Sequence, residues 1–420
     1  MFAVFRQRGF SLLWIGNVIS MVGDWILLVA LPFYVFQRTG SALASGAMFI
    51  VEVIPMLLLG SVAGVFVDRW NRKKTIIVTN VSSALVLFLL LFVQSKNGLW
   101  LVYVVAFTEA VLACFASPAY SAVVPLLVKE KQLSAANSMN KLGVEMTRLL
   151  GPALGSVLLG LSGLMSIILV DSVSFLFCAF TIVFISLPTS TGSNDTKGFH
   201  TPTTVYTLVW REWIEGLQLM RRTQVIAAVF VITSVSMIGE GFGRVVFIPF
   251  LSLVLHQGAI ALGWVLTVQG IGGVLGSLVN ERLTKWLSPW ILIGWSGIVL
   301  GLLNLVAVLF PKLPVLLCIY LFGGGPVMFF FVGLYTLLQQ HTGNAYRGRI
   351  FGAYNTTNTL LLLAGMLLSS TFTNILGPLL MFALMGVFYF LAGVIALFLL
   401  RNIRIYVGKI GVSEVASKNT

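Results

Sequence analysis

Six acidic residues interrupt long apolar stretches of this 420-residue sequence, and they are the side chains best suited to do chemistry. They are Asp24, Glu52, Glu109, Glu145, Asp171 and Glu240. A charged side chain at the centre of a bilayer costs about 2.5 to 3.5 kcal/mol on insertion scales, so each acid needs a partner, water or a proton. Carboxyl groups in such places are typical of proton relays and of substrate pathways.

Two of these acids have a basic residue one helical turn away. Glu145 and Arg148 are spaced i, i+3, and Glu240 and Arg244 are spaced i, i+4, so each pair can share a helix face and neutralise itself. A local ion pair is the structural interpretation. The functional alternative is a switch, in which protonation of the carboxylate releases the arginine for another partner.

Asp24 has no basic residue within a helical turn, so it must bind a partner on another helix, face water or be neutral. A carboxyl withdrawn from water can carry a proton, and we expect Asp24 to be the first candidate for proton coupling or substrate binding. Its alternative is a structural hydrogen bond. Glu240 ranks second, as its counterpart in the second half, whereas Glu52 and Glu109 can also lie near a span end or face a wet cavity.

The elements that position these side chains are predicted to be membrane-spanning helices. Hydrophobic residues make up 58% of the chain and charged residues only 9%, whereas a soluble domain carries roughly a quarter charged residues. The apolar runs match a hydrocarbon core ~30 Å thick. We predict an all-α membrane protein with twelve transmembrane helices in two six-helix bundles. The predicted spans are 11–36, 42–67, 75–94, 99–123, 142–161, 164–187, 225–255, 259–280, 287–309, 313–338, 350–376 and 378–400.

This count divides the chain into an N-terminal bundle at 1–187, a connector at 188–224, a C-terminal bundle at 225–400 and a tail at 401–420. The connector is polar, and we expect it to begin as a flexible segment and to end as a short surface helix.

A weak internal repeat relates the two bundles. Gly23 and Asp24 precede Pro32 much as Gly239 and Glu240 precede Pro249. Two related halves are typical of alternating-access transporters.

The formal net charge of +13 does not indicate nucleic-acid binding, because the basic residues lie between spans and form no stripe interleaved with aromatic residues. If alternate loops face opposite compartments, one side holds only Arg38, Lys96 and Lys312. Arg148 and Arg244 lie within spans, and the rest of the 26 basic residues fall on the other side. This asymmetry places both termini and the connector in the cytoplasm.

Cys114, Cys178 and Cys318 lie in apolar runs without paired or metal-ligand spacing, and we predict that they are buried small hydrophobic residues. The sequence therefore indicates neither a metal site nor a cofactor. A nucleophile with a nearby base is also not apparent, since no histidine lies inside a span, so we do not expect an enzyme.

The segment GSVAGVFVDRWNRKK at 60–74 resembles the cytoplasmic signature between the second and third helices of the major facilitator superfamily. The matching residues are Gly64, Asp68, Arg69, Arg72 and Lys73. The resemblance implies that these residues latch the cytoplasmic side and regulate opening. The basic residues also have a topological explanation, and both roles can hold together.

In the fifth span, Gly143 with Gly151, Pro152 and Gly155 resembles the antiporter signature of drug exporters in this superfamily. Small residues and a proline permit close helix packing and a bend.

Three further segments, 5–32, 123–138 and 171–175, resemble the branch that contains macrolide efflux proteins and the enterobactin exporter. The fourth span lacks the arginine that many proton-coupled drug antiporters carry there, so Arg148 or Arg244 would have to substitute.

We therefore expect a monomeric transporter in a bacterial plasma membrane, with a lipid bilayer, a small molecule and protons as its partners. It would export a hydrophobic or amphipathic, macrolide-like solute in exchange for protons. The alternatives are an exporter of one metabolite or siderophore, an importer, and a non-transporting receptor or scaffold. The receptor would need a partner-binding domain, and a connector of about 35 residues is too short for one.

Overall fold

The computed structural model describes residues 2–93, 98–186, 202–220, 223–343 and 346–401. These residues form helices joined by short turns, and no strand occurs among them. The α-helices are α1 (Arg8–Thr39), α2 (Ala42–Arg69), α3 (Arg72–Leu87), α4 (Trp100–Leu127), α5 (Leu133–Val183), α6 (Pro202–Met220), α7 (Gln224–Pro249), α8 (Ala259–Trp286), α9 (Pro289–Leu309), α10 (Leu313–His341), α11 (Arg347–Leu376) and α12 (Pro378–Arg401).

Within the described ranges, 11 helices are long and apolar enough to cross a membrane. A helix satisfies all of its backbone hydrogen bonds internally, which is what the bilayer core demands of a spanning segment. One of them, α5, has 51 residues and includes Gly163 at φ 71 and ψ −169, outside the helical region. A continuous helix of that length would be about 77 Å long, more than twice the hydrocarbon thickness. Gly163 thus divides α5 into a first and a second segment, which gives the twelve spans that the sequence predicts.

The turns between spans use local capping. Gly40 ends α1 with φ 65, and the Ser41 hydroxyl accepts a 3.3 Å hydrogen bond from the Ala44 amide at the start of α2. Asn71 begins α3 by accepting a 3.1 Å hydrogen bond from the Lys74 amide. These caps satisfy amide groups that the first helical turn leaves free.

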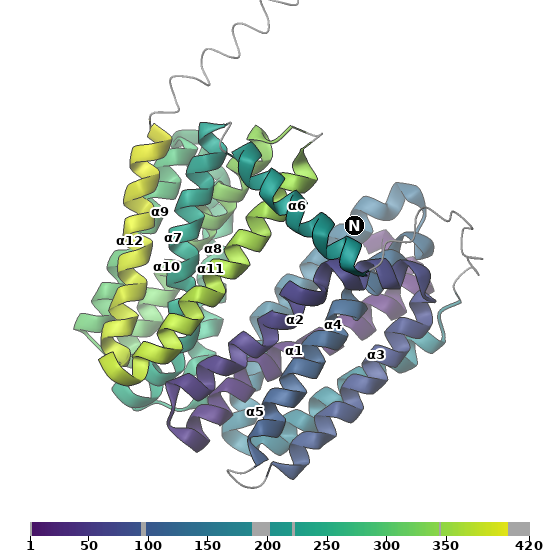
Figure 1. Cartoon of the computed structure of the whole chain (residues 1–420). Coiled ribbons are helices and arrows are strands. Elements are labelled where there is room, and N and C mark those ends of the chain that lie inside the picture. Colours follow the sequence, from purple (N-terminus) through teal and green to yellow (C-terminus); the bar gives the residue numbers. More distant parts are fainter. Residues whose placement is uncertain (1, 94–97, 187–201, 221–222, 344–345, 402–420) are drawn as a thin grey trace, which may run out of the picture. The chain divides into compact units, whose positions relative to one another are not determined.

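The chain divides into two compact units, the first formed by residues 1–209 and 256–267 and the second by 210–255 and 268–420. In the first unit, α1 packs along α5, and α3 packs against α4 and α5. In the second unit, α7 packs against α11 and α12, and α12 also contacts α9 (Figure 1).

The same helix contacts recur in both units. Gly23 of α1 faces Asp171 in the second segment of α5, and Gly239 of α7 faces Phe388 of α12. Gly155 in the first segment of α5 faces α1, and Gly241 of α7 faces α11. The first helix of each half therefore packs against the fifth and sixth spans of that half, in agreement with the repeat seen in the sequence.

Helix α6 falls within the predicted connector, and its second half packs on α11. Trp213 Nε1 donates a 3.2 Å hydrogen bond to Thr357 Oγ1, and Glu215 pairs with Arg349 at 3.4 Å. Trp210 remains 60% exposed. Residue 187 at the end of the predicted N-terminal bundle, residues 188–201 and 221–222 of the connector, and residues 402–420 of the tail lie outside the described residues.

Candidate functional site

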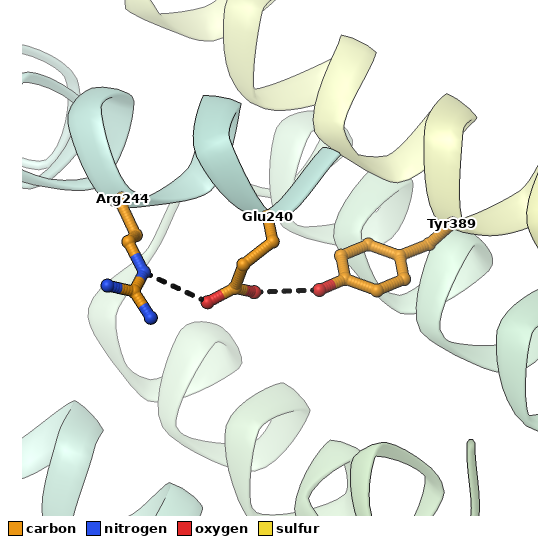
Figure 2. Close-up of polar contacts among 3 residues, drawn as sticks. All are labelled: Glu240, Arg244 and Tyr389. Carbon is orange, nitrogen blue, oxygen red and sulfur yellow. Dashed lines mark hydrogen bonds and ion pairs between the residues drawn. The ribbon is translucent and has the colours of Figure 1, made fainter. Parts of the chain in front are cut away.

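In the second unit, the carboxylate of Glu240 is held from two sides (Figure 2). Arg244, one turn further along α7, donates from Nε to Oε1 at 3.3 Å, and Tyr389 of α12 donates from its hydroxyl to Oε2 at 2.8 Å. The Tyr389 side chain is buried, whereas the side chains of Glu240 and Arg244 are 35% and 44% exposed. The predicted ion pair is thus present, with a tyrosine from another helix added to it.

Arg244 uses only part of its guanidinium group in this contact. Its two terminal nitrogens make no hydrogen bond or ion pair within the described residues. A guanidinium offers five N–H donors in a planar fork, and carboxylates and phosphates bind to it in a bidentate manner. Arg244 can therefore bind a solute acceptor while it still neutralises Glu240.

In the first unit, three acids from three elements lie within electrostatic range of one another. Asp24 belongs to α1, Glu109 to α4 and Asp171 to the second segment of α5. No base in the described ranges forms an ion pair with any of them. We name Asp24, Glu109 and Asp171 the acid cluster.

The members of the acid cluster differ in burial. Asp171 is fully buried, its Oδ1 accepts a 3.0 Å hydrogen bond from Ser174, and its Oδ2 has no hydrogen-bond partner among the residues that the structure describes. Glu109 is half-buried and interacts with the Ser83 hydroxyl, and its buried Oε1 has no hydrogen-bond partner in the described part of the chain. Asp24 is the exposed member. Burial of unpaired charge is costly, and the binding of a proton removes that charge, so the cluster is chemically suited to hold protons.

The remaining predicted acids lie elsewhere. Glu145 and Arg148 are both exposed on the first segment of α5, and they form no ion pair with each other. The prediction of a local pair is therefore wrong here, in keeping with the small gain that exposed side chains obtain from pairing. Glu52 lies half-buried on α2.

The motif at 60–74 covers the end of α2, a short turn and the start of α3. Asp68 and Arg69 are exposed, whereas Arg72 and Lys73 are half-buried. A side chain at Gly64 would meet no atom within 4 Å.

Lys73 has a defined structural partner. Its Nζ donates to the carbonyl oxygens of Val183 at 2.8 Å and Ile185 at 2.7 Å. The last carbonyls of a helix have no intrahelical partner and carry the negative end of the helix dipole. Lys73 therefore caps the second segment of α5.

The glycines of the fifth-span motif set the approach of α1 to α5. Gly143, Gly151 and Gly155 are buried, and a Cβ atom at Gly155 would lie 2.9 Å from the Ile26 Cα atom. A Cβ atom at Gly151 would overlap Trp25. Pro152 is buried within the same segment.

Sequence reasoning missed two polar side chains, both tyrosines. Tyr389 binds Glu240, and the Tyr120 hydroxyl lies 2.8 Å from the Cys178 sulfur. A tyrosine within an apolar span is the signal that points to such contacts, because its hydroxyl needs a partner when buried. Cys178 is buried as predicted, but Cys114 is only half-buried and Cys318 is exposed, so the prediction of burial is wrong for Cys318.

Comparison with known proteins places these features in a family. The family model described as Major Facilitator Superfamily matches residues 13–366, and a second match covers 241–414.

Two of the similar proteins are drug exporters by name. Macrolide efflux protein A of Streptococcus pyogenes is 25% identical over 377 residues, which cover 88% of this chain and 90% of that protein. Multidrug efflux pump Tap of Mycolicibacterium fortuitum is 26% identical over 398 residues, with 87% and 92% covered. A third relative, the Staphyloferrin A transporter of Staphylococcus aureus (strain NCTC 8325 / PS 47), is 22% identical over 389 residues, with 89% and 91% covered.

Solved transporter structures share the fold. A bacterial homologue of the iron transporter ferroportin, in an inward-facing state, gives a TM-score of 0.69 at 16% identity, with 93% of this chain and 98% of that chain covered. A POT family transporter in complex with 5-aminolevulinic acid gives 0.70 at 11% identity, with 93% and 96% covered.

Proposed function

Since this chain belongs to the major facilitator superfamily and is a multi-pass membrane transporter, we propose that it exports a hydrophobic or amphipathic small molecule in exchange for protons. In this proposal, alternating access exposes a bound solute first to one side of the membrane and then to the other. Two relatives named for macrolide and multidrug efflux support outward transport of a macrolide-like solute.

The acid cluster is the observation that supports proton coupling in this proposal. Three carboxyls lie within electrostatic range, with no base paired to them among the described residues. Such a group is stable in an apolar unit when it binds protons, and it becomes charged when it releases them. Asp24, as the exposed member, exchanges its proton with water or responds to the solute.

Glu240 and Arg244 supply a second part of the mechanism. Protonation of Glu240 weakens its attraction for Arg244, whose guanidinium then binds a solute acceptor more fully. Tyr389 keeps the protonated carboxyl in place through its hydrogen bond.

The proposed setting is a bacterial plasma membrane, with a monomer whose two termini are cytoplasmic. The bundles at 1–187 and 225–400 act as the two halves, and 188–224 connects them. Asp68 and Arg69, both exposed, serve as the latch on the cytoplasmic side.

A siderophore exporter is the second candidate function. It is favoured by the unused donors of Arg244, which suit a solute with a negatively charged group, and by the relative named Staphyloferrin A transporter. An importer uses the same parts in the opposite direction.

The test is erythromycin transport into inverted membrane vesicles from an efflux-deficient bacterial host. We expect a pH gradient to drive uptake, an uncoupler to abolish it, and Asp24→Asn to abolish the gradient-driven component. Glu130→Gln, an exposed acid in the turn before α5, is the matched control. If Asp24→Asn still gives uptake that the uncoupler collapses, Asp24 has no role in coupling.

The identity of the solute is tested separately by growth of the same host in macrolides, cationic dyes or excess siderophore. Protection against one class alone identifies the chemical class of the solute. Protection against siderophore load alone would favour the second candidate.

A further inference from the structure

We propose that protons reach and leave the acid cluster through a file of polar side chains inside the first unit, which leads to the end of the unit that carries Lys73. This inference rests on the proposed exchange of solute for protons. We name the file the polar seam, and its members are Thr75, Thr79, Asn80, Ser83, Tyr120, Ser174, Cys178 and Thr181.

The seam begins at the acid cluster on one face of the second segment of α5. Asp171, Ser174, Cys178 and Thr181 follow one another at intervals of three or four residues, and all four are buried. This spacing aligns side chains along one face of a helix. The Ser174 and Thr181 hydroxyls each donate a 2.8 Å hydrogen bond to a carbonyl oxygen of their own helix, and each hydroxyl oxygen can still accept a hydrogen bond from the interior.

Helix α3 presents a second polar face to the same interior. Its buried polar residues are Thr75, Thr79, Asn80 and Ser83, which again recur about once per turn. Ser83 interacts with Glu109 of the acid cluster, and Thr75 lies in the first turn of the helix, next to the motif. Both helices therefore carry polar groups from the acid cluster towards the same end of the unit.

Hydrogen bonds join three elements in the middle of the seam. Asn80 Nδ2 donates to the Tyr120 hydroxyl at 3.0 Å, and that hydroxyl lies 2.8 Å from Cys178 Sγ. The carboxylate of Asp24 acts electrostatically on both the Tyr120 hydroxyl and the Cys178 thiol. Both protic groups thus lie within electrostatic range of the acid cluster.

The helical rise gives the depth that the seam covers. Asp171 and Cys178 are separated by about 10 Å along the helix axis, and Val183 lies about 7.5 Å beyond Cys178. The Val183 carbonyl is bound by Lys73, at the end of the unit where the motif lies. Steps of three or four residues within one helix are about 4.5 to 6 Å, a separation that one water molecule can bridge between polar groups.

Helix α1 leaves space for the seam where it crosses α5. Gly23 faces the carboxylate of Asp171, and Gly16 faces the Thr181 hydroxyl and Cys178, whose sulfur would lie 3.3 Å from a Cβ atom at Gly16. Ser20, between the two glycines, is buried as well. On the α1 side, glycine backbone thus lies against Asp171 and Thr181, while Cys178 also packs in a cluster with apolar side chains that include Phe10 and Leu13.

Proton transfer along the seam leaves each group unchanged. The Tyr120 hydroxyl and the Cys178 thiol can each donate to the other. Each group accepts a proton on a lone pair and passes its own proton to the next group or water, so one proton enters and one leaves. Asn80 does not carry the proton but orients the Tyr120 hydroxyl.

The test measures proton binding without any solute. Purified full-length protein in detergent is mixed from alkaline into mildly acidic buffer, and a pH-indicator dye follows proton uptake by stopped flow. The component of proton uptake that belongs to the acid cluster is identified by its loss in Asp24→Asn and in the double variant Glu109→Gln, Asp171→Asn. We expect Tyr120→Phe and Cys178→Ala to slow this component about tenfold and to leave its amplitude unchanged, since each removes one protic group from the route.

Two variants distinguish a proton route from an effect of the substitutions on packing alone. Cys178→Ser retains a protic group and should restore the rate lost in Cys178→Ala. Tyr34→Phe is the matched control, because Tyr34 is a buried tyrosine of the same unit whose hydroxyl binds the Val93 carbonyl, outside the seam. Where Tyr120→Phe does not fold, the two Cys178 variants decide the question.

The outcomes also distinguish the seam from the proposed function. Uptake that depends on the acid cluster but is unchanged in Tyr120→Phe and Cys178→Ala overturns the seam and leaves proton coupling intact. Uptake that does not depend on the acid cluster overturns both.

Discussion

The hydroxyl of Tyr389 donates a 2.8 Å hydrogen bond to Glu240 Oε2, so α12 fixes the acid of α7. The first helix of the first unit has a different neighbour. There Gly23 of α1 faces the carboxylate of Asp171, in the second segment of α5. One half thus gives its acid a hydrogen-bond donor and a base, and the other half adds further acids. This asymmetry is the structural basis on which we propose different roles for Glu240 and Asp24.

Tyr389→Phe should weaken the second unit by about 1.5 to 3 kcal/mol, the usual value of a hydrogen bond to a charged group. Glu240→Gln should lose the ion pair with Arg244 but keep an acceptor for Tyr389. Thermal unfolding of the purified single and double variants measures the coupling between the two side chains. The variant Glu240→Ala removes the acceptor altogether, so strictly additive effects of Tyr389→Phe and Glu240→Ala would show that the hydrogen bond contributes nothing to stability.

Gly155→Ala should destabilise the first unit by about 1 to 3 kcal/mol, because the new methyl group would press on the α1 backbone. Gly60→Ala is the matched control, since a Cβ atom there meets nothing within 4 Å. It should be neutral or slightly stabilising, as alanine favours a helix more than glycine does. The measurement is the melting temperature in detergent, and equal shifts for both variants would contradict the close packing of α1 on α5.

Lys73→Met should free the last carbonyls of α5 and lower stability by about 1 to 2 kcal/mol. The neighbouring residue Lys74 is exposed, so Lys74→Met removes the same charge without removing this cap. Melting temperature and proteolysis near residue 185 report the effect. A loss of stability that is the same in both variants would assign the role of Lys73 to net charge alone.

Gly23→Ala should lower the yield of folded protein sharply, because its methyl group would overlap the Asp171 carboxylate. Asp171→Ala in the same chain should restore the yield, since it removes the overlapping atoms. Size-exclusion chromatography of the purified variants measures the folded fraction. A normal yield for Gly23→Ala alone would be incompatible with the observed contact.

The spans were predictable from the sequence, because a bilayer imposes a length and an apolar composition on each crossing. The Glu240–Arg244 pair was predictable for a similar reason, as both residues lie on one helix. The same spacing argument failed for Glu145 and Arg148, whose exposed side chains have little to gain from pairing. The sequence also predicted two spans on either side of Gly163, although no polar loop separates them.

The partners that come from other helices could not be predicted. Tyr389 lies far along the chain from Glu240, and Cys178 lies far from Tyr120, so no local pattern connects them. The grouping of Asp24, Glu109 and Asp171 depends on how three helices pack. Hydropathy identifies each of these helices but not the side chains that meet between them.

The contact between Gly23 and Asp171 also bears on how the chain is made. A ribosome delivers α1 to the membrane well before the second segment of α5, and domains generally fold from the N-terminus during synthesis. Asp171 then enters at a cost of about 2.5 to 3.5 kcal/mol if it is charged at the bilayer centre. The helix that covers Asp171 is synthesised before Asp171 itself, so the order of synthesis supplies the cover before the acid that needs it.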